Sequence, residues 1–177
     1  MLVKGEKTMI CEKLEKAFND QINAEFYSEY FYLSMLAYFE QQNMQGFKNW
    51  MNIQMQEERA HAFGLFHYLH ERGGKVKLEQ IDKPRTDWNS PLEVMEEVLK
   101  HEKLVTSKIN ALTDAAEEAK DRAAVSFLDW YVKEQVEEEA NVERVLKTMK
   151  NICNDKLCMY MFDKELGERK FHAPEIG

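Results

Sequence analysis

Four glutamates and one histidine are the residues of this chain whose types and spacing could do chemistry. Glu25, Glu58, Glu102 and Glu138 each interrupt an apolar stripe of helical spacing, near the middle of that stripe. His61 follows Glu58 by three residues, which is about one helical turn, so both side chains project from one helix face and could hold one ion between them.

The apolar stripes run through residues 22–36, 47–69, 92–112 and 124–149. A carboxylate in the dehydrated centre of a helical bundle is costly unless a counter-charge is present. Four carboxylates would formally balance two divalent cations, with His61 as a neutral ligand. A solvated helix face is the alternative for any one glutamate, but four central interruptions together predict a buried site for two metals.

Composition narrows the class of protein. The chain has 177 residues, a formal charge of −8 and 32% charged residues, which disfavours a nucleic-acid surface and is compatible with cation binding. We expect no nucleic-acid partner. No segment has the length and apolarity of a signal peptide or a membrane span, so we expect no membrane contact and a cytoplasmic location.

The three cysteines, Cys11, Cys153 and Cys158, are odd in number and form no Cys-x-x-Cys motif. This argues against a disulfide framework and against a thiolate zinc or rubredoxin-type iron centre. Their role is left open.

The elements that must position the site are helices, because the long stripes have a 3.6-residue period and few prolines or glycines interrupt them. An all-α fold follows: four long helices over about 9–151, a short fifth helix over about 155–166, and a tail over 167–177. Capping residues predict the helix limits. The first helix runs from about Met9 to Gln41 with Thr8 as a possible cap, and the second runs from a possible cap at Asn43 to about Arg72. The third begins at Ser90-Pro91 and ends near Glu118, the fourth runs from its cap Asp121 to about Asn151, and the fifth runs from Asp155 to Leu166 and is closed by Gly167.

The connections predict the topology. The first and second helices, and the third and fourth, are joined by only a few residues, so each pair forms an antiparallel hairpin. Residues 73–90, which include a strand-like patch at 75–78, could extend to about 55–60 Å. The second helix is only ~45 Å long. This crossover can therefore run the length of the bundle, which makes helices two and three parallel and brings the four glutamates to one level.

At this point the chain resembles the ferritin family, in its non-haem bacterial and archaeal form, over about residues 9–169. The blocks that carry the resemblance are 21–28 (QINAEFYS), 56–61 (QEERAH), 101–103 (HEK), 130–139 (WYVKEQVEEE) and 162–166 (FDKEL). The resemblance implies one ferritin-like domain over residues 1–177, made of a four-helix bundle with a short fifth helix.

One departure distinguishes the chain from symmetrical di-iron bundles, which carry two Glu-x-x-His motifs. The second motif is replaced here by Gln135-Val136-Glu137-Glu138. We therefore expect an unsymmetrical centre, with one metal held by Glu25, Glu58 and His61. The other metal would have Glu58 as the bridging ligand, Glu102 and Glu138, with Gln135 as a neutral neighbour.

The same comparison disfavours other relatives. Bacterioferritins have a haem-ligating Met directly after the bridging Glu, where this chain has Arg59, so no haem is expected. Rubrerythrins need a Cys-x-x-Cys module, and the mini-ferritins that protect DNA lack a fifth helix.

The resemblance implies a ferroxidase that stores iron: two Fe²⁺ ions are oxidised by O₂ or H₂O₂ at the di-iron centre, and ferric oxide mineral accumulates inside a homo-oligomeric shell of 24 subunits. Tyr32 would hydrogen-bond a ligand or donate an electron, and Trp130 could do the same, although packing is the alternative for both. Glu57, Glu134 and Glu137 would form a third iron site facing the cavity, or simply a solvated acidic face. Glu29 has a helical spacing from Glu25 that permits ligation, but the resemblance selects Glu25.

Two other functions remain open. One is a di-metal oxidase or peroxidase of the same superfamily that does not store mineral, and the other is a non-catalytic helical assembly with an acidic core. A large hollow shell would separate iron storage from both.

Overall fold

The protein was analysed as a computed structural model that describes residues 9–152 and 155–176. Its helices are α1 (Glu12–Gln41), α2 (Gln45–Glu71), α3 (Pro91–Glu118), α4 (Arg122–Ile152) and α5 (Lys156–Leu166). Within the described residues there are no strands, which confirms the all-α fold class. None of the described helices combines the length and the apolarity that crossing a membrane requires.

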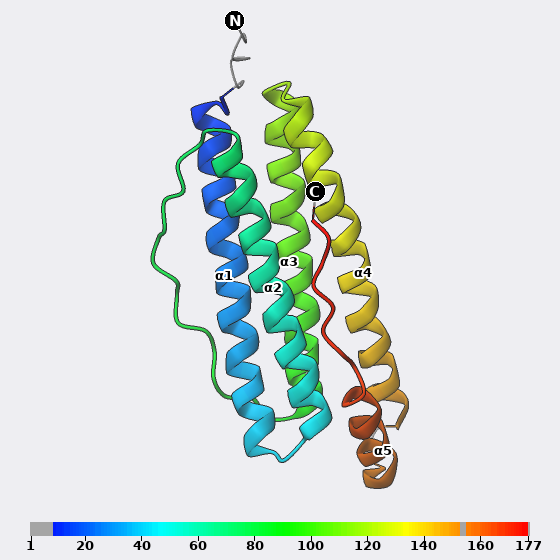
Figure 1. The fold of residues 1–177 in the computed structure, drawn as a ribbon. Coiled ribbons are helices and arrows are strands. Elements are labelled where there is room, and N and C mark those ends of the chain that lie inside the picture. The colour runs from blue at the N-terminus through cyan, green and yellow to red at the C-terminus, as the bar shows by residue number, and fades with distance from the viewer. Residues whose placement is uncertain (1–8, 153–154, 177) are drawn as a thin grey trace, which may run out of the picture.

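The four long helices form the predicted up-and-down pairs joined by a long crossover (Figure 1). α1 and α2 are antiparallel, and so are α3 and α4. The segment between α2 and α3 runs along the outside of α1 over most of the bundle, which makes α2 and α3 parallel. α5 lies at the end of the bundle where α2 begins and α4 ends, and the residues after it turn back along the bundle.

The helix limits mostly agree with the capping signals. The Ser90 hydroxyl accepts from the Glu93 amide at 3.1 Å, and the Asp121 carboxylate accepts from the Ala124 amide at 3.1 Å. α1 begins at Glu12, later than the predicted Met9, because the chain before it is held outside the helix: the Ile10 amide donates to the Arg72 carbonyl at 3.2 Å. The possible cap Thr8 lies outside the described residues.

The prediction that Asn43 caps α2 was wrong. Asn43 has a left-handed backbone conformation (φ 56°) in the turn before the helix, and α2 has no capping hydrogen bond from its own N-cap residue, Met44. The acceptor comes instead from α5, where the Asp163 carboxylate accepts from the Phe47 amide at 2.9 Å. The turn and the cap are therefore supplied by different parts of the chain.

The strand-like patch at 75–78 is not a strand; it is part of the extended crossover. It is held to α1 by Asn19, whose amide nitrogen donates to the Lys75 carbonyl at 3.0 Å and whose oxygen accepts from the Lys77 amide at 2.6 Å. A side chain of α1 thus takes the hydrogen bonds that a neighbouring strand would have provided.

The apolar core consists of two clusters, one towards each end of the bundle. In all four long helices the two clusters are separated along the helix by a short polar interval. In α1, for example, Ile22 belongs to one cluster and Phe31 to the other, with Glu25 and Ser28 buried between them. The fold therefore contains a buried polar layer at mid-height.

Candidate metal centre

The buried polar layer contains every residue that the sequence predicted for the two-metal site. Glu25 lies on α1, Glu58 and His61 on α2, Glu102 on α3, and Gln135 and Glu138 on α4. Their exposed fractions are between 0% and 5%. Four helices thus bring four carboxyl groups, one imidazole and one amide into one water-excluded layer.

Glu25, Glu58 and His61 form the tightest group in this layer. Each of them offers one potential ligand atom, and these three atoms lie within 4.8 Å of one another. Oε2 of Glu25, Oε2 of Glu58 and Nε2 of His61 are buried and have no hydrogen-bond partner within the described part of the protein. Buried polar atoms are almost always paired, so three unpaired atoms at one place indicate a cation-binding site.

Glu102 lies beside this group and is oriented by two neighbours. Its Oε1 accepts a hydrogen bond from the Tyr32 hydroxyl, and its Oε2 accepts from Nε2 of Gln135 at 3.3 Å. Gln135 also donates to the Thr106 hydroxyl oxygen at 3.2 Å. Tyr32 and Gln135 therefore contact a predicted ligand directly, as expected for residues next to the site.

Glu138 is held from α2, because its Oε2 accepts from Nε2 of Gln54 at 2.9 Å. Glu102 and Glu138 are not members of the tight three-residue group. They are close enough to it to raise the pKa of Glu58 by charge repulsion. The layer is accordingly unsymmetrical, with a histidine-containing half and an all-oxygen half.

The pKa values follow from burial and from mutual repulsion of the carboxylates. Burial, and then the Glu138 charge, raise the pKa of Glu102 to about 8. Burial, and then Glu57, raise the pKa of Glu138 to about 7. Burial also raises the pKa of Glu25 and Glu58, and it lowers that of His61 to about 4. Without a cation these carboxyl groups tend to hold protons, whereas His61 is neutral and ready to ligate.

The donor set fits hard or borderline divalent metals. Carboxylate oxygens favour iron in both oxidation states, can bridge two ions, and a neutral imidazole completes one coordination sphere. Binding metal would satisfy the three unpaired atoms and also neutralise the carboxylates.

The predicted third-site residues lie at the side of this layer, on α2 and α4. Glu57 and Glu134 are half-buried, and Glu137 is exposed. Burial, and then the Glu138 and Glu137 charges, raise the pKa of Glu134 to about 7. Glu57 forms an ion pair with Arg169, with 2.7 Å between Oε2 and Nη2.

The structure shows the contacts of Trp130 and Glu29, two residues whose roles the sequence left open. The Trp130 ring is half-buried and meets the His61 ring edge to face, with 5.5 Å between the ring centroids. The Glu29 carboxylate accepts from Nε of Arg59 at 2.9 Å. Glu29 therefore pairs with a surface cation, whereas Glu25, one turn away, belongs to the buried group.

Several residues that support the ligands were given no role from the sequence. Nε2 of Gln21 donates to Oε1 of Glu25 at 2.7 Å, and the Tyr131 hydroxyl donates to the His61 carbonyl at 2.8 Å. Gln21 and Gln54 each precede a predicted ligand by four residues, a spacing that could have identified them. Arg169 lies beyond the helices and gave no such signal.

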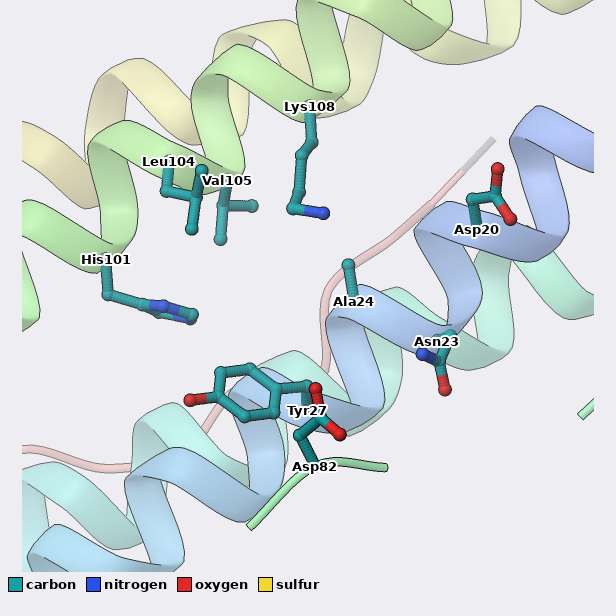
Figure 2. A pocket seen from close by; sticks show the side chains of 9 residues that line it. All are labelled: Asp20, Asn23, Ala24, Tyr27, Asp82, His101, Leu104, Val105 and Lys108. Atoms are coloured by element: carbon teal, nitrogen blue, oxygen red, sulfur yellow. The ribbon is translucent and has the colours of Figure 1, made fainter. Parts of the chain in front are cut away.

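A surface pocket of about 320 Å³ lies on the other side of the bundle, between α1, α3 and the crossover. Figure 2 shows Lys108 and His101 of α3 projecting toward α1, with Tyr27 and Asp82 below them. His101 is buried and its Nε2 lies 2.8 Å from the Ser28 hydroxyl oxygen. None of the predicted metal ligands lines this pocket. The pocket is therefore separate from the group of ligands at the centre of the bundle.

Neither of the two described cysteines belongs to the buried polar layer. Cys11 and Cys158 are exposed free thiols, and Cys153 lies outside the described residues.

Comparisons with known proteins agree in one family. The model of the ferritin-like domain matches residues 15–152. A "bacterial non-heme ferritin" of Bacteroides fragilis (strain 638R) is 43% identical over 91% of this chain and 100% of its own length. The protein of that name from Staphylococcus aureus (strain MRSA252) is 36% identical over 92% of this chain and 98% of its own.

Solved structures give the same result. An Archaeoglobus fulgidus ferritin engineered into a closed form superposes with a TM-score of 0.91 at 46% identity, covering 92% of this chain and 99% of the other. The open-pore ferritin of that archaeon superposes with a TM-score of 0.89 at 46% identity, covering 91% and 99%.

Proposed function

The chain belongs to the ferritin family, and on that premise we propose that it is a ferroxidase that stores iron. It binds two Fe²⁺ ions in the buried polar layer, transfers their electrons to O₂ or H₂O₂, and deposits the ferric product as oxide mineral. The observation that carries this proposal is the buried group of Glu25, Glu58 and His61. These residues offer ligand atoms within 4.8 Å of one another, and each also has a buried polar side-chain atom without a hydrogen-bond partner.

The residues divide the work between two metal positions. Glu25, Glu58 and His61 bind the first Fe²⁺. Glu58 bridges to the second, which Glu102 and Glu138 complete. Because the second position has only oxygen ligands and no histidine, it holds iron less firmly, which suits an ion that must leave for the mineral.

The neighbouring side chains position these ligands. Tyr32 and Gln135 fix the two oxygens of Glu102, and Gln21 fixes one oxygen of Glu25. The unbonded oxygen of Glu25 is thereby directed to the metal. Haem has no role in this proposal. Arg59 occupies the position after the bridging Glu where bacterioferritins have a haem-ligating Met, and its side chain pairs with Glu29.

We propose that the whole chain forms one ferritin-like domain. Twenty-four copies of it would assemble into a shell in the cytoplasm. The competing function, a di-metal oxidase or peroxidase without mineral storage, would use the same ligands. Only storage requires the shell, so assembly size and iron load distinguish the two.

The test is the rate of Fe²⁺ oxidation in air, followed by ferric absorbance, with two Fe²⁺ added per chain. Glu58→Ala and His61→Ala remove a bridging and a terminal ligand, so we expect the fast phase to fall by at least about 100-fold, towards the rate without protein. A larger Fe²⁺ addition to the wild type, with size-exclusion chromatography and light scattering, should give an iron-filled 24-subunit particle.

Glu29→Gln is the matched control. Glu29 is a glutamate of α1 one turn from Glu25, but it pairs with Arg59 at the surface. This variant should keep the wild-type rate. If Glu58→Ala and His61→Ala both oxidise iron as fast as Glu29→Gln does, the site is assigned wrongly. A small particle with intact oxidation would favour the oxidase function.

A further inference from the structure

The segment after α5 returns along the bundle beside α2 and α4 (Figure 1). Through Arg169 it contacts Glu57, one of the predicted third-site carboxylates. It is attached near its start. Nδ2 of Asn49 donates to the Arg169 carbonyl at 3.0 Å, and the Arg169 guanidinium lies over the Trp50 ring, 5.3 Å from its centroid. These contacts fix the Arg169 side chain at one place on α2.

The Arg169 guanidinium connects the third-site residues with the di-metal layer. Nη2 donates to Oε2 of Glu57 at 2.7 Å, and Nη1 donates to Oε1 of Gln54. Nε2 of Gln54 in turn donates to Oε2 of Glu138 at 2.9 Å. A positive charge thus stands between Glu57 and a proposed ligand of the second metal.

We propose that Arg169 restrains metal binding at the third site: its guanidinium pairs with Oε2 of Glu57 and places a positive charge beside that carboxylate, so a cation binds Glu57 less tightly than it would without Arg169. This inference rests on the proposed function, because it concerns iron that leaves the di-iron centre. Arg169 is a positioning residue and contacts none of the unpaired ligand atoms.

The physical basis is competition for one carboxylate. A charge-assisted hydrogen bond between guanidinium and carboxylate is stronger than a neutral one, and a second donor contact to Gln54 holds the guanidinium in position. A cation that binds Oε2 of Glu57 must break that pair, and a cation at the other oxygen is repelled by the guanidinium charge.

The experiment measures Zn²⁺ binding, because Zn²⁺ is not oxidised and reports affinity alone. Crystals of the assembled full-length protein are equilibrated at graded Zn²⁺ concentrations, and anomalous diffraction gives the occupancy at each position. Arg169→Gln should increase the Zn²⁺ affinity at Glu57 about tenfold, which is what loss of one competing ion pair of modest strength produces.

Two variants separate local competition from overall charge. Lys170→Gln removes the same charge from the neighbouring, exposed residue and should leave affinity at Glu57 unchanged. Arg169→Lys keeps a cation there and should stay within about threefold of the wild type. Adding Glu57→Gln to Arg169→Gln should abolish the extra Zn²⁺.

The inference is overturned if Arg169→Gln and Lys170→Gln bind Zn²⁺ at Glu57 equally, if Arg169→Lys tightens binding as much as Arg169→Gln does, or if the extra ion persists without Glu57. Zn²⁺ at Glu25, Glu58 and His61 is read from the same maps. Its absence would count against the proposed function, whereas its presence with an unchanged Glu57 position would count against Arg169 alone.

Discussion

At the scale of single residues, the centre is a set of carboxyl groups held in a water-excluded layer without a counter-charge. Glu102 and Glu138 have pKa values of about 8 and 7, far above the ordinary value of 4.5, chiefly because of burial. Without metal, the protein therefore binds protons at the oxygens that the proposed function assigns to cations. Protons and metal compete for the same oxygens.

This competition predicts an unusual pH dependence of stability. Between the unfolded pKa of 4.5 and the folded values of about 7 and 8, the folded state holds more protons than the unfolded state, so stability falls as pH rises. His61 and His101, with folded pKa values of about 4 against 6.5, act oppositely, but only between those two values. From pH 6.5 to 8 the carboxyl groups decide the sign. Glu102 and Glu138 together lose about 2 kcal/mol of stability over this range, so the Tm of the metal-free protein should fall by roughly 5–10 °C.

The measurement is calorimetry of the metal-free protein across that pH range. Glu102→Gln cannot ionise at this position, so it should reduce the slope. Saturating Zn²⁺ should abolish or reverse it, since metal binding favours the ionised carboxylates. A Tm that rises with pH in the metal-free wild type would contradict these assignments of protonation.

At the scale of elements, α5 completes α2. The backbones of the two helices approach so closely that a Cβ built on Gly46 would lie 1.5 Å from the Asp163 carbonyl oxygen. Only glycine permits this contact, and it places the Asp163 carboxylate on the Phe47 amide. The short helix is thus a capping element for the bundle.

Asp163→Ala removes that cap and leaves a free amide at the start of α2. We expect a loss of about 1 kcal/mol in the free energy of unfolding, or roughly 2–4 °C in Tm. Glu165→Ala, at an exposed position of the same helix, is the control and should change Tm by less than about 1 °C. Equal effects of the two substitutions in thermal unfolding would show that Asp163 does not act as a cap.

The helices were predictable from the sequence where the signal was local. Ser90 with Pro91, and Asp155 before α5, carry their own capping acceptors, and both helices begin as expected. The prediction from Asn43 failed because the acceptor that caps α2 is the Asp163 carboxylate, 116 residues beyond the Phe47 amide that it binds. The patch at 75–78 has the composition of a strand, but its backbone binds the Asn19 side chain of α1 and no neighbouring strand, so it remains an extended loop.

That the proposed site residues share one buried layer was predictable for a related reason. A glutamate in an apolar stripe is conspicuous within one helix, and equal heights in four helices bring such residues together. The residues that support them are less visible. The roles of Gln54 and Arg169 follow from their contacts in the folded structure. Arg169 also lies on a segment without helical periodicity, so its sequence context gave no signal.

At the scale of the whole molecule, an exposed apolar area remains on the side of α1, α2 and the crossover. Phe63, Leu78 and Ile81 are 43%, 74% and 40% exposed, and they line a groove with Phe26 and Phe66. Contiguous apolar surface of this kind usually marks an interface between proteins. It supports the proposed homo-oligomer, in which copies of the chain would cover this area.

In the proposed shell, the side of the bundle that carries the third-site carboxylates would face the interior. The returning segment with Arg169 would then lie between the proposed di-iron centre and the mineral. The segments outside the four long helices also contribute. The crossover connects α2 to α3, α5 caps α2 through Asp163, and the tail carries Arg169 to Glu57.

The most direct test of the central claim is anomalous diffraction at the iron absorption edge from crystals loaded anaerobically with Fe²⁺. We predict two strong peaks in the buried layer of each chain, one bounded by Glu25, Glu58 and His61 and the other by Glu58, Glu102 and Glu138. Iron elsewhere, with no peak in contact with Glu58, would contradict the assignment of this layer as the ferroxidase centre.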